Sequence, residues 1–236
     1  MRLSPSPARG SIRLLTIAAA LAGSPALARE SDEDSPWSFE GVIASEYISK
    51  GTGKSGEDPG FEARIEREFG MAYAGAWAAN AITSQGGDAE FQLYAGAGAT
   101  AGPVELDGRI TYKTAPGTAD GFQDDWIELR GSASTRVGKT RLALKVEYSP
   151  DSYALTEQAW WAEAEVSRPI AEDWTVSAGY GVREQDGGAD YRAWNAGVTW
   201  DVRDGVALDL RWYDTDSHHL GETYEGRLHA SVTVSF

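Results

Sequence analysis

Apolar and polar residues alternate with a period of two along most of this chain. The clearest case is RLALKVEY at residues 141–148, where large apolar side chains occupy every second position. Successive side chains of a β-strand point to opposite faces, so the pattern predicts strands with one apolar and one polar face. Twelve such segments are predicted, at residues 37–48, 60–69, 71–80, 89–100, 103–113, 124–137, 140–149, 158–168, 173–183, 190–202, 205–214 and 223–236.

The connections between these segments alternate in length. Short turns are expected near residues 70, 101–102, 138–139, 169–172 and 203–205. Longer polar loops are expected near residues 49–59, 81–88, 114–123, 150–157, 184–189 and 215–222. This alternation is typical of outer-membrane barrels, whose strands need only about 9–11 residues each. The sequence therefore predicts an all-β fold: a single antiparallel transmembrane β-barrel of about 12 strands, with short periplasmic turns and longer extracellular loops.

The pattern alone does not say which face of the sheet meets water. Aromatic residues gather near the segment ends, as in the interfacial girdles of membrane barrels. They are Trp37, Phe39, Tyr47, Phe61, Phe69, Trp126, Trp174, Trp194, Trp200 and Trp212. The apolar face carries one charge, Arg67, close to a turn where a lipid-facing charge costs least. Twelve strands also exceed what a small, filled soluble barrel needs. These features favour a membrane barrel over a soluble periplasmic ligand-binding barrel, which remains the alternative.

The amino end has the features of a secretory signal peptide. Arginines precede a short apolar run at residues 14–23, and Ala26-Leu27-Ala28 offers a cleavage site. The run is too short to be a membrane-spanning helix. We therefore expect residues 1–28 to be a cleaved signal peptide, residues 29–36 a disordered acidic leader, and residues 37–236 the barrel, located in the outer membrane of a Gram-negative cell.

Composition excludes several other classes of protein. The formal charge is −15 over the whole chain, which makes nucleic acid an unfavourable partner. There are no cysteines, so disulfide bonds and thiol chemistry are both excluded. No cofactor is expected.

The last strand ends on an aromatic residue. In residues 227–236, Leu228, Ala230, Val232, Val234 and Phe236 alternate with polar residues and are predicted to face lipid. A terminal phenylalanine resembles the carboxy-terminal signal by which the barrel-assembly machinery recognises its substrates. Phe236, together with Trp174 and Trp200, is predicted to anchor the barrel at the membrane interface.

Four short motifs resemble one known family. SEYISKGTG at residues 45–53 is similar to a Tyr-x-x-Arg-Gly signature, with Lys50 in place of arginine. GMAYAGAWAAN at residues 70–80, WYDTD at residues 212–216 and the closing VTVSF complete the pattern. Together they resemble the TorF-type porins (Gcw_chp), proteobacterial proteins of unknown function. The resemblance implies an outer-membrane barrel with a transport role and no catalytic residues. Lys50 puts any role of a bidentate arginine at that position in doubt.

Many charged residues fall on the predicted inner face. The candidates for lining a pore are Glu62, Arg64, Glu66, Arg109, Arg130, Lys145, Glu163, Glu165, Arg211 and Arg227. They could form ion pairs that stiffen the wall, or select among small polar solutes, and both roles stay open. The loops are rich in acids and predict a mouth that attracts cations. Candidates there are Asp124, Asp125, Asp186, Asp214 and Asp216, while Lys50 and Lys54 are among the few loop bases.

Two histidine patterns suggest chemistry, and neither supports an enzyme. His218 and His219 follow two aspartates, but adjacent histidines usually diverge, so no metal site is predicted. His229 and Ser231 are about 7 Å apart at strand spacing, beyond the reach that nucleophilic catalysis requires. The sequence therefore predicts a narrow porin for small polar or cationic solutes. The alternatives are a closed structural or surface-interaction barrel and the soluble ligand-binding barrel.

Overall fold

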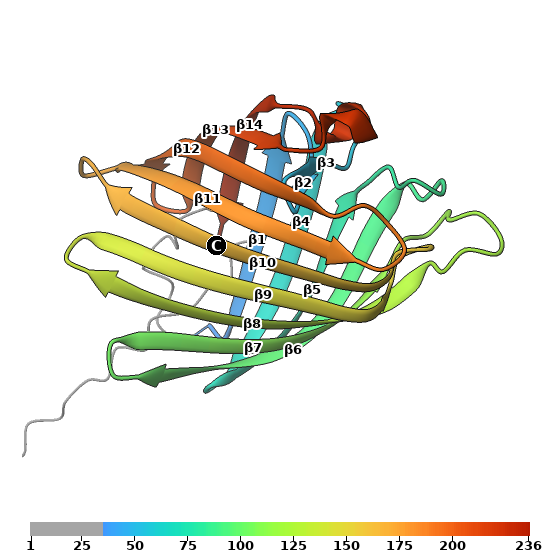
Figure 1. The fold of residues 1–236 in the computed structure, drawn as a ribbon. Coiled ribbons are helices and arrows are strands. Elements are labelled where there is room, and N and C mark those ends of the chain that lie inside the picture. The colour runs from blue at the N-terminus through green and yellow to red at the C-terminus, as the bar shows by residue number, and fades with distance from the viewer. Residues whose placement is uncertain (1–34) are drawn as a thin grey trace, which may run out of the picture.

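The computed structural model describes residues 35–236 of the 236-residue chain. The predicted signal peptide, and the predicted leader up to residue 34, lie outside the described residues. Twelve strands close into one antiparallel barrel (Figure 1). They are β1 (Trp37–Ala44), β4 (Gly60–Phe69), β5 (Ala72–Asn80), β6 (Ala89–Ala101), β7 (Val104–Thr114), β8 (Asp125–Val137), β9 (Thr140–Ser152), β10 (Glu157–Pro169), β11 (Trp174–Gln185), β12 (Tyr191–Arg203), β13 (Val206–Thr215) and β14 (Arg227–Ser235).

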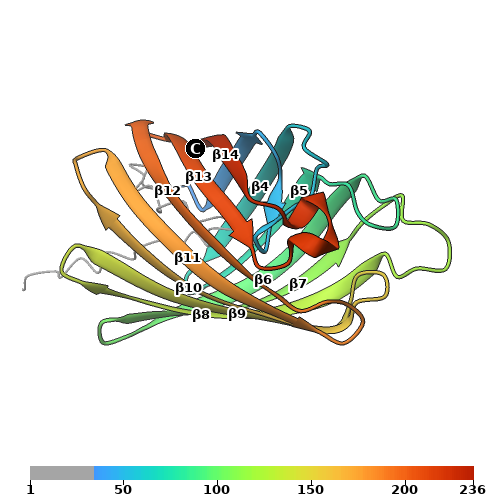
Figure 2. The same cartoon turned by 45° about the horizontal axis from the view of Figure 1, so that its top comes forward.

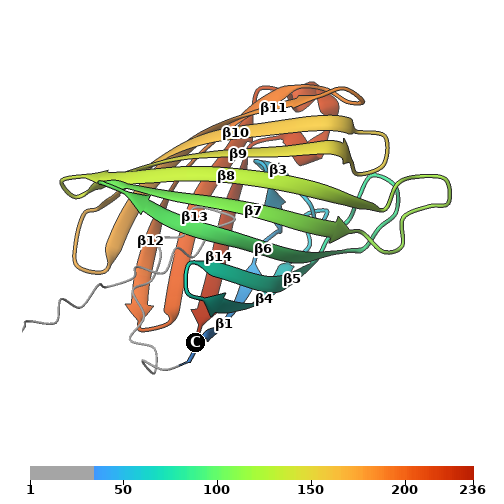
Figure 3. The same ribbon diagram turned by 90° about the horizontal axis from the view of Figure 1, so that it is seen from below.

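Each barrel strand pairs with its neighbours in sequence, and β1 pairs with β14 to close the ring. The short turns gather at one end of the barrel and the longer connections at the other (Figures 1 and 3). We call these the short-turn end and the loop end. The all-β barrel of twelve strands is confirmed, and the predicted segments match the strands closely. Within residues 35–236, no helix is long and apolar enough to cross a membrane.

The two faces of the wall have opposite polarity. Large apolar side chains cover the outside and are exposed, such as Ile43 (58%), Leu144 (61%) and Leu228 (63%). Charged side chains point inward and are buried, such as Glu147 (2%) and Arg211 (1%). A soluble barrel would have the reverse arrangement, because burying charge in place of apolar groups costs free energy. The exposed apolar belt is far more extensive than scattered surface residues, and indicates an apolar surrounding.

The seam between β1 and β14 ends at the last residue of the chain. The Phe39 backbone N–H donates to the Phe236 carbonyl at 2.8 Å, and the Phe236 N–H donates back to Phe39 at 3.0 Å. Their rings stack with centroids 5.7 Å apart. Phe236 is 60% exposed on the outer surface. The terminal aromatic thus completes both the ladder and the outer face of the closing strand.

Aromatic residues also mark the outer surface at the short-turn end. Trp174 and Trp200 stack with centroids 5.4 Å apart, and both are exposed. Arg67 lies over the rings of Trp37 and Phe69, at 5.2 Å and 5.0 Å, so this outward charge rests on aromatic faces.

Two aromatics assigned to the girdles are placed differently, and that assignment is wrong for them. Tyr47 is buried inside the barrel against Trp77. Trp126 shares the strand parity of Glu128, points inward, and lies 5.9 Å from the Lys113 ammonium. Position near a strand end does not determine the face, whereas parity along the strand does.

The first connection departs from its prediction as an outer loop. The first strand was predicted to continue to residue 48 but ends at Ala44. The chain then turns into the barrel and forms a small two-stranded sheet, β2 (Ile48–Ser49) and β3 (Thr52–Gly53), which lies towards the loop end in Figure 1. The last strand also starts later than predicted, at Arg227, after two 3-10 turns, η1 (His218–Leu220) and η2 (Glu222–Tyr224). These turns lie at the loop end, in the connection between β13 and β14 (Figure 2).

Candidate functional site

The inward hairpin, residues Ile48–Gly53, has a tight two-residue turn at its tip. Lys50 (φ 53°) and Gly51 (φ 80°) are both left-handed, as a type I′ turn requires. Glycine suits the second position for another reason: a Cβ on Gly51 would collide with the Cβ of Ala193 on β12. The motif that resembles Tyr-x-x-Arg-Gly is therefore the start and tip of a hairpin pressed against the inner wall.

Lys50 fixes the tip of the hairpin to the opposite wall. Its ammonium lies 2.6 Å from Glu128 Oε2 on β8 and 3.0 Å from Glu147 Oε2 on β9. Both carboxylates are almost fully buried, with side-chain exposures of 5% and 2%. The Tyr191 hydroxyl on β12 donates to the Lys50 carbonyl at 3.1 Å. A lysine expected in an outer loop is thus an internal cation that neutralises two buried carboxylates, so its assignment to the loop exterior is wrong.

The base of the hairpin is held by the walls where it enters. The Tyr47 ring packs on Trp77 with centroids 5.5 Å apart. The Arg227 guanidinium donates to Glu46 Oε2 at 2.6 Å, and His229 Nε2 lies 3.0 Å from the Glu46 carbonyl. These contacts come from β5 and β14, whereas the tip reaches β8 and β9 on the other side of the ring. The inward hairpin therefore crosses the lumen.

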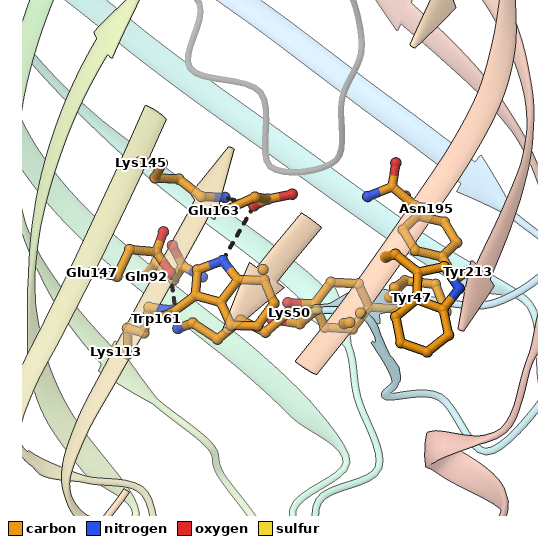
Figure 4. A pocket seen from close by; sticks show the side chains of 16 residues that line it. Tyr47, Lys50, Gln92, Lys113, Lys145, Glu147, Trp161, Glu163, Asn195 and Tyr213 are labelled. Atoms are coloured by element: carbon orange, nitrogen blue, oxygen red, sulfur yellow. Dashed lines mark hydrogen bonds and ion pairs between the residues drawn. The ribbon is translucent and has the colours of Figure 1, made fainter. Parts of the chain in front are cut away.

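A small cavity of about 50 Å³ remains beside the hairpin. Figure 4 shows its lining, in which Lys50 and Tyr47 of the hairpin segment meet side chains of the walls. Trp161 lies flat on Gly181, where a Cβ would collide with the indole, and donates to Glu163 at 3.2 Å. Such a volume holds only a few water molecules. With the hairpin in this position, the lumen is constricted at this level.

All ten pore-lining candidates have strand parity that places them on the inner face. The structure brings most of them into pairs with other groups, and not into one cluster. Arg64 contacts Glu40 at 2.9 Å, Lys145 contacts Glu163 at 2.8 Å, and Glu165 contacts Arg141 at 3.8 Å. Glu62 accepts a hydrogen bond from Trp77 at 3.3 Å. Glu66 lies on the same face of β4 as these two β4 residues, Glu62 and Arg64.

Arg211 is at the centre of the densest polar network in the wall. Its Nε and Nη2 donate to the two carboxylate oxygens of Asp209 at 3.1 Å and 3.0 Å. It also donates to Asn195 Oδ1 and Ser177 Oγ, each at 2.7 Å. These partners lie on β11, β12 and β13, so one buried guanidinium ties three strands together.

The acidic mouth candidates lie at the loop end in two different settings. Asp124, Asp125 and Asp186 are exposed. Asp214 lies 2.7 Å from His218 Nε2, and Asp216 lies 3.7 Å from Arg192. The Arg192 backbone N–H donates to Asp216 and holds the pKa of its carboxyl below the usual range. Within residues 35–236, no cluster of three or more His, Cys, Asp or Glu side chains is placed to hold a metal ion.

The residues that build the constriction were not predicted from the sequence. Trp161 and Trp77 were not singled out, and Lys50 was counted with the loops. The local signal in the sequence is Gly51, since glycine readily adopts the positive φ that a two-residue hairpin turn requires. Tyr47 and Ile48 beside it are too apolar for a loop in water. Their position after a shortened first strand is what turns the segment inward.

The chain matches one family of proteins across nearly its whole length. The model of the family described as bacterial protein of unknown function (Gcw_chp) matches residues 30–235. The comparison with curated proteins gave no match.

Solved structures with a similar fold include porins and channels. The KdgM porin aligns with a TM-score of 0.56 and 11% identity, over 84% of this chain and 99% of that chain. The NanC porin aligns with a TM-score of 0.57 and 9% identity, over 85% and 98%. An outer membrane channel from Pseudomonas putida F1 aligns with a TM-score of 0.54 and 10% identity, over 86% and 96%. At these identities the likeness establishes the fold, that of a porin-like barrel.

Proposed function

Because the chain belongs to the Gcw_chp family of bacterial proteins and has a porin-like fold, we propose that it is an outer-membrane channel for small polar solutes. We further propose that it is a channel of the TorF type. Its apolar belt would lie in outer-membrane lipid, and its last strand, ending at Phe236, would be recognised by the barrel-assembly machinery. In this arrangement the short-turn end faces the periplasm and the loop end faces outward.

The observation that carries the channel proposal is the way the lumen is filled. A barrel closed for structural reasons alone would gain most from a tightly packed apolar interior. Here the interior is lined by ion pairs, and the segment that crosses it is held largely by polar contacts at Lys50 and Glu46. A hairpin attached in this way would narrow a passage that is lined by polar groups. The narrowness favours small solutes over large ones.

A closed structural barrel is the second candidate. The cavity of about 50 Å³ beside the hairpin favours it, because no solute larger than water fits there without movement of the hairpin.

The exposed acids Asp124, Asp125 and Asp186 support a preference of the proposed channel for cations. They would concentrate cations at the mouth, so that small cationic solutes enter more readily than anions.

Electrical recording separates these candidates. Purified protein should first migrate differently before and after heating in detergent, as folded membrane barrels do. In planar lipid bilayers bathed in potassium chloride solution, we expect discrete current steps of small conductance. Absence of steps from folded protein would reject the channel and favour the closed barrel. A reversal potential in a salt gradient that favours chloride would contradict the proposed cation preference of the mouth.

Lys54 makes the ion preference of this channel dependent on pH. It follows the inward hairpin, and burial together with the charge of Arg183 lowers the pKa of Lys54 to about 8. As the pH rises past that value, the loop end loses a positive charge. We expect the reversal potential to shift towards cation preference between one pH unit below this value and one unit above it. The measurement is repeated with Lys54→Met, which should remove the shift.

The same pKa has a consequence for stability. An unfolded lysine titrates near 10.5, so the unfolded chain binds more protons than the folded one between pH about 8 and 10.5. The folded protein therefore gains stability as the pH rises through this window, and Lys54→Met should lack that gain. For the reversal-potential test, an equal shift with pH in the original protein and in Lys54→Met would show that Lys54 is not the titrating group.

A further inference from the structure

Unsatisfied polar atoms are concentrated on one patch of the inner wall. Among residues 35–236, most buried side-chain N and O atoms without a hydrogen-bond partner lie on the adjacent strands β6, β7, β8 and β9. They belong to Gln92, Tyr94, Arg109, Thr111, Arg130 and Glu147. The register makes this patch continuous, because Tyr94 pairs with Thr111 and Arg109 pairs with Arg130. Buried polar atoms normally have partners, so such a concentration marks a place where something polar binds.

Arg109, on the inner face of β7, has a donor edge that is unpartnered within residues 35–236. Its side chain is buried (6% exposed), and both Nε and Nη2 lack a partner among the described residues. These two nitrogens share one edge of the guanidinium, which forms two parallel hydrogen bonds to a carboxylate. The face of the guanidinium lies over the Tyr94 ring, at 4.8 Å from its centroid. The ring holds the guanidinium in place and leaves its donor edge free.

Arg130 adds a third donor beside this edge. It lies directly opposite Arg109 in the antiparallel register, is 5% exposed, and its Nε is also unpartnered. Its Nη2 contacts Asp107 Oδ1 at 3.3 Å, while the Tyr73 hydroxyl donates to Asp107 Oδ2 at 2.7 Å. Asp107 is thus already occupied by two donors. It orients Arg130 and balances one of the two guanidinium charges.

Two of the acids that attract Arg109 are bound by lysines. Glu128 and Glu147 are both bound by Lys50, with Lys113 also 3.1 Å from Glu128. Glu66 on β4 also attracts Arg109, and Arg64 lies near it. The two arginines and Asp107 by themselves carry one positive charge in excess. Two like guanidinium charges in adjacent strands repel each other, and a bound anion relieves that repulsion.

We propose that Arg109 and Arg130 form a binding site for the carboxylate of a small solute inside the lumen. Arg109 binds the carboxylate side-on through Nε and Nη2, and Arg130 Nε contributes a third hydrogen bond. This site lies in mid-strand, apart from the acidic residues of the mouth. The inference rests on the proposed channel only for access, since a solute must enter the lumen to reach it.

The test compares gluconate with sorbitol, which has the same carbon chain and no charge. Binding to purified protein in detergent micelles is measured by titration calorimetry, and block of the ionic current is measured in planar bilayers. We expect gluconate to bind and to interrupt the current, and sorbitol to do neither. Arg109→Gln should weaken gluconate binding by about tenfold or more, because two hydrogen bonds to a charged group are lost. Arg109→Lys keeps the charge but lacks the paired N–H donors of the guanidinium. Its affinity for gluconate should lie between those of the original protein and Arg109→Gln.

Arg141→Gln is the matched control, because it removes the same charge from the same wall at a paired, partly exposed arginine. It should leave gluconate binding unchanged. If Arg109→Gln does not fold, as judged by heat-dependent migration, Arg109→Lys decides the matter. Current steps without gluconate binding would overturn the site and leave the channel intact. Gluconate binding without current steps would overturn the channel and keep the site. An equal loss of binding in Arg141→Gln would show general attraction by charge, and would also overturn the site.

Discussion

Replacing Lys50 with methionine is expected to enlarge the conductance of the barrel and to destabilise it. Lys50 is the contact between the tip of the inward hairpin and the wall at β8 and β9. Removing one member of a buried ion pair costs about 3–5 kcal/mol, because the partner charge stays buried without compensation. Glu128 keeps Lys113 at 3.1 Å, which places the expected loss towards the lower end of that range. The hairpin, no longer attached at its tip, then leaves the lumen more often.

The measurements are single-channel conductance and unfolding by guanidinium chloride in lipid vesicles. Lys139→Met is the control, since Lys139 is an exposed residue in a short turn, and both quantities should stay unchanged. Combining Lys50→Met with Glu147→Gln should restore part of the lost stability while the conductance stays high, because the uncompensated charge is gone but the tip is still free. Lower stability with unaltered conductance would show that the hairpin does not limit the passage.

Replacing Leu144 with arginine is expected to destabilise the barrel in lipid by about 2–4 kcal/mol, the cost of an arginine facing the middle of a bilayer. Leu144 is 61% exposed on the outer face, near the middle of a transmembrane stretch of β9. In a soluble barrel, the same substitution at so exposed a position would change the stability by no more than about 0.5 kcal/mol. The result therefore distinguishes a lipid-facing surface from a water-facing one.

Leu155 offers a matched control for this experiment. It has nearly the same exposure, 62%, but lies in the connection between β9 and β10 at the loop end. Leu155→Arg should unfold at the same denaturant concentration as the original protein in vesicles. Equal behaviour of the two variants would contradict a lipid-facing outer belt and would support the soluble barrel.

The wall of the barrel was predictable from sequence because the alternation of apolar and polar residues within each strand determines which side chains face outward. In residues 141–148 the alternation alone separates Leu144, outside, from Lys145, inside, and the same rule orients the strand that ends at Phe236. The rule failed at 71–80, where small residues fill both faces. There the structure shows Tyr73 and Trp77 pointing inward, with Trp77 3% exposed.

The constriction was not predictable in the same way. Whether a polar segment such as residues 45–59 points outward or inward depends on partners distant in sequence, here Glu128, Glu147 and Tyr191. Such partners do not show in the local pattern. The arginine pair is similar, since a long loop joins β7 to β8 and the register that brings Arg109 opposite Arg130 is set by pairing along the whole strands.

The seam between β1 and β14 determines how this protein must fold. Glu40 pairs with Ser235, so the contact that closes the ring joins residues almost the full length of the chain apart. Until it forms, both strands present unpaired backbone edges, which invite pairing with other chains. Contacts this distant in sequence form slowly because a large loop must close first. We therefore expect closure of this seam to be the step at which aggregation competes with folding.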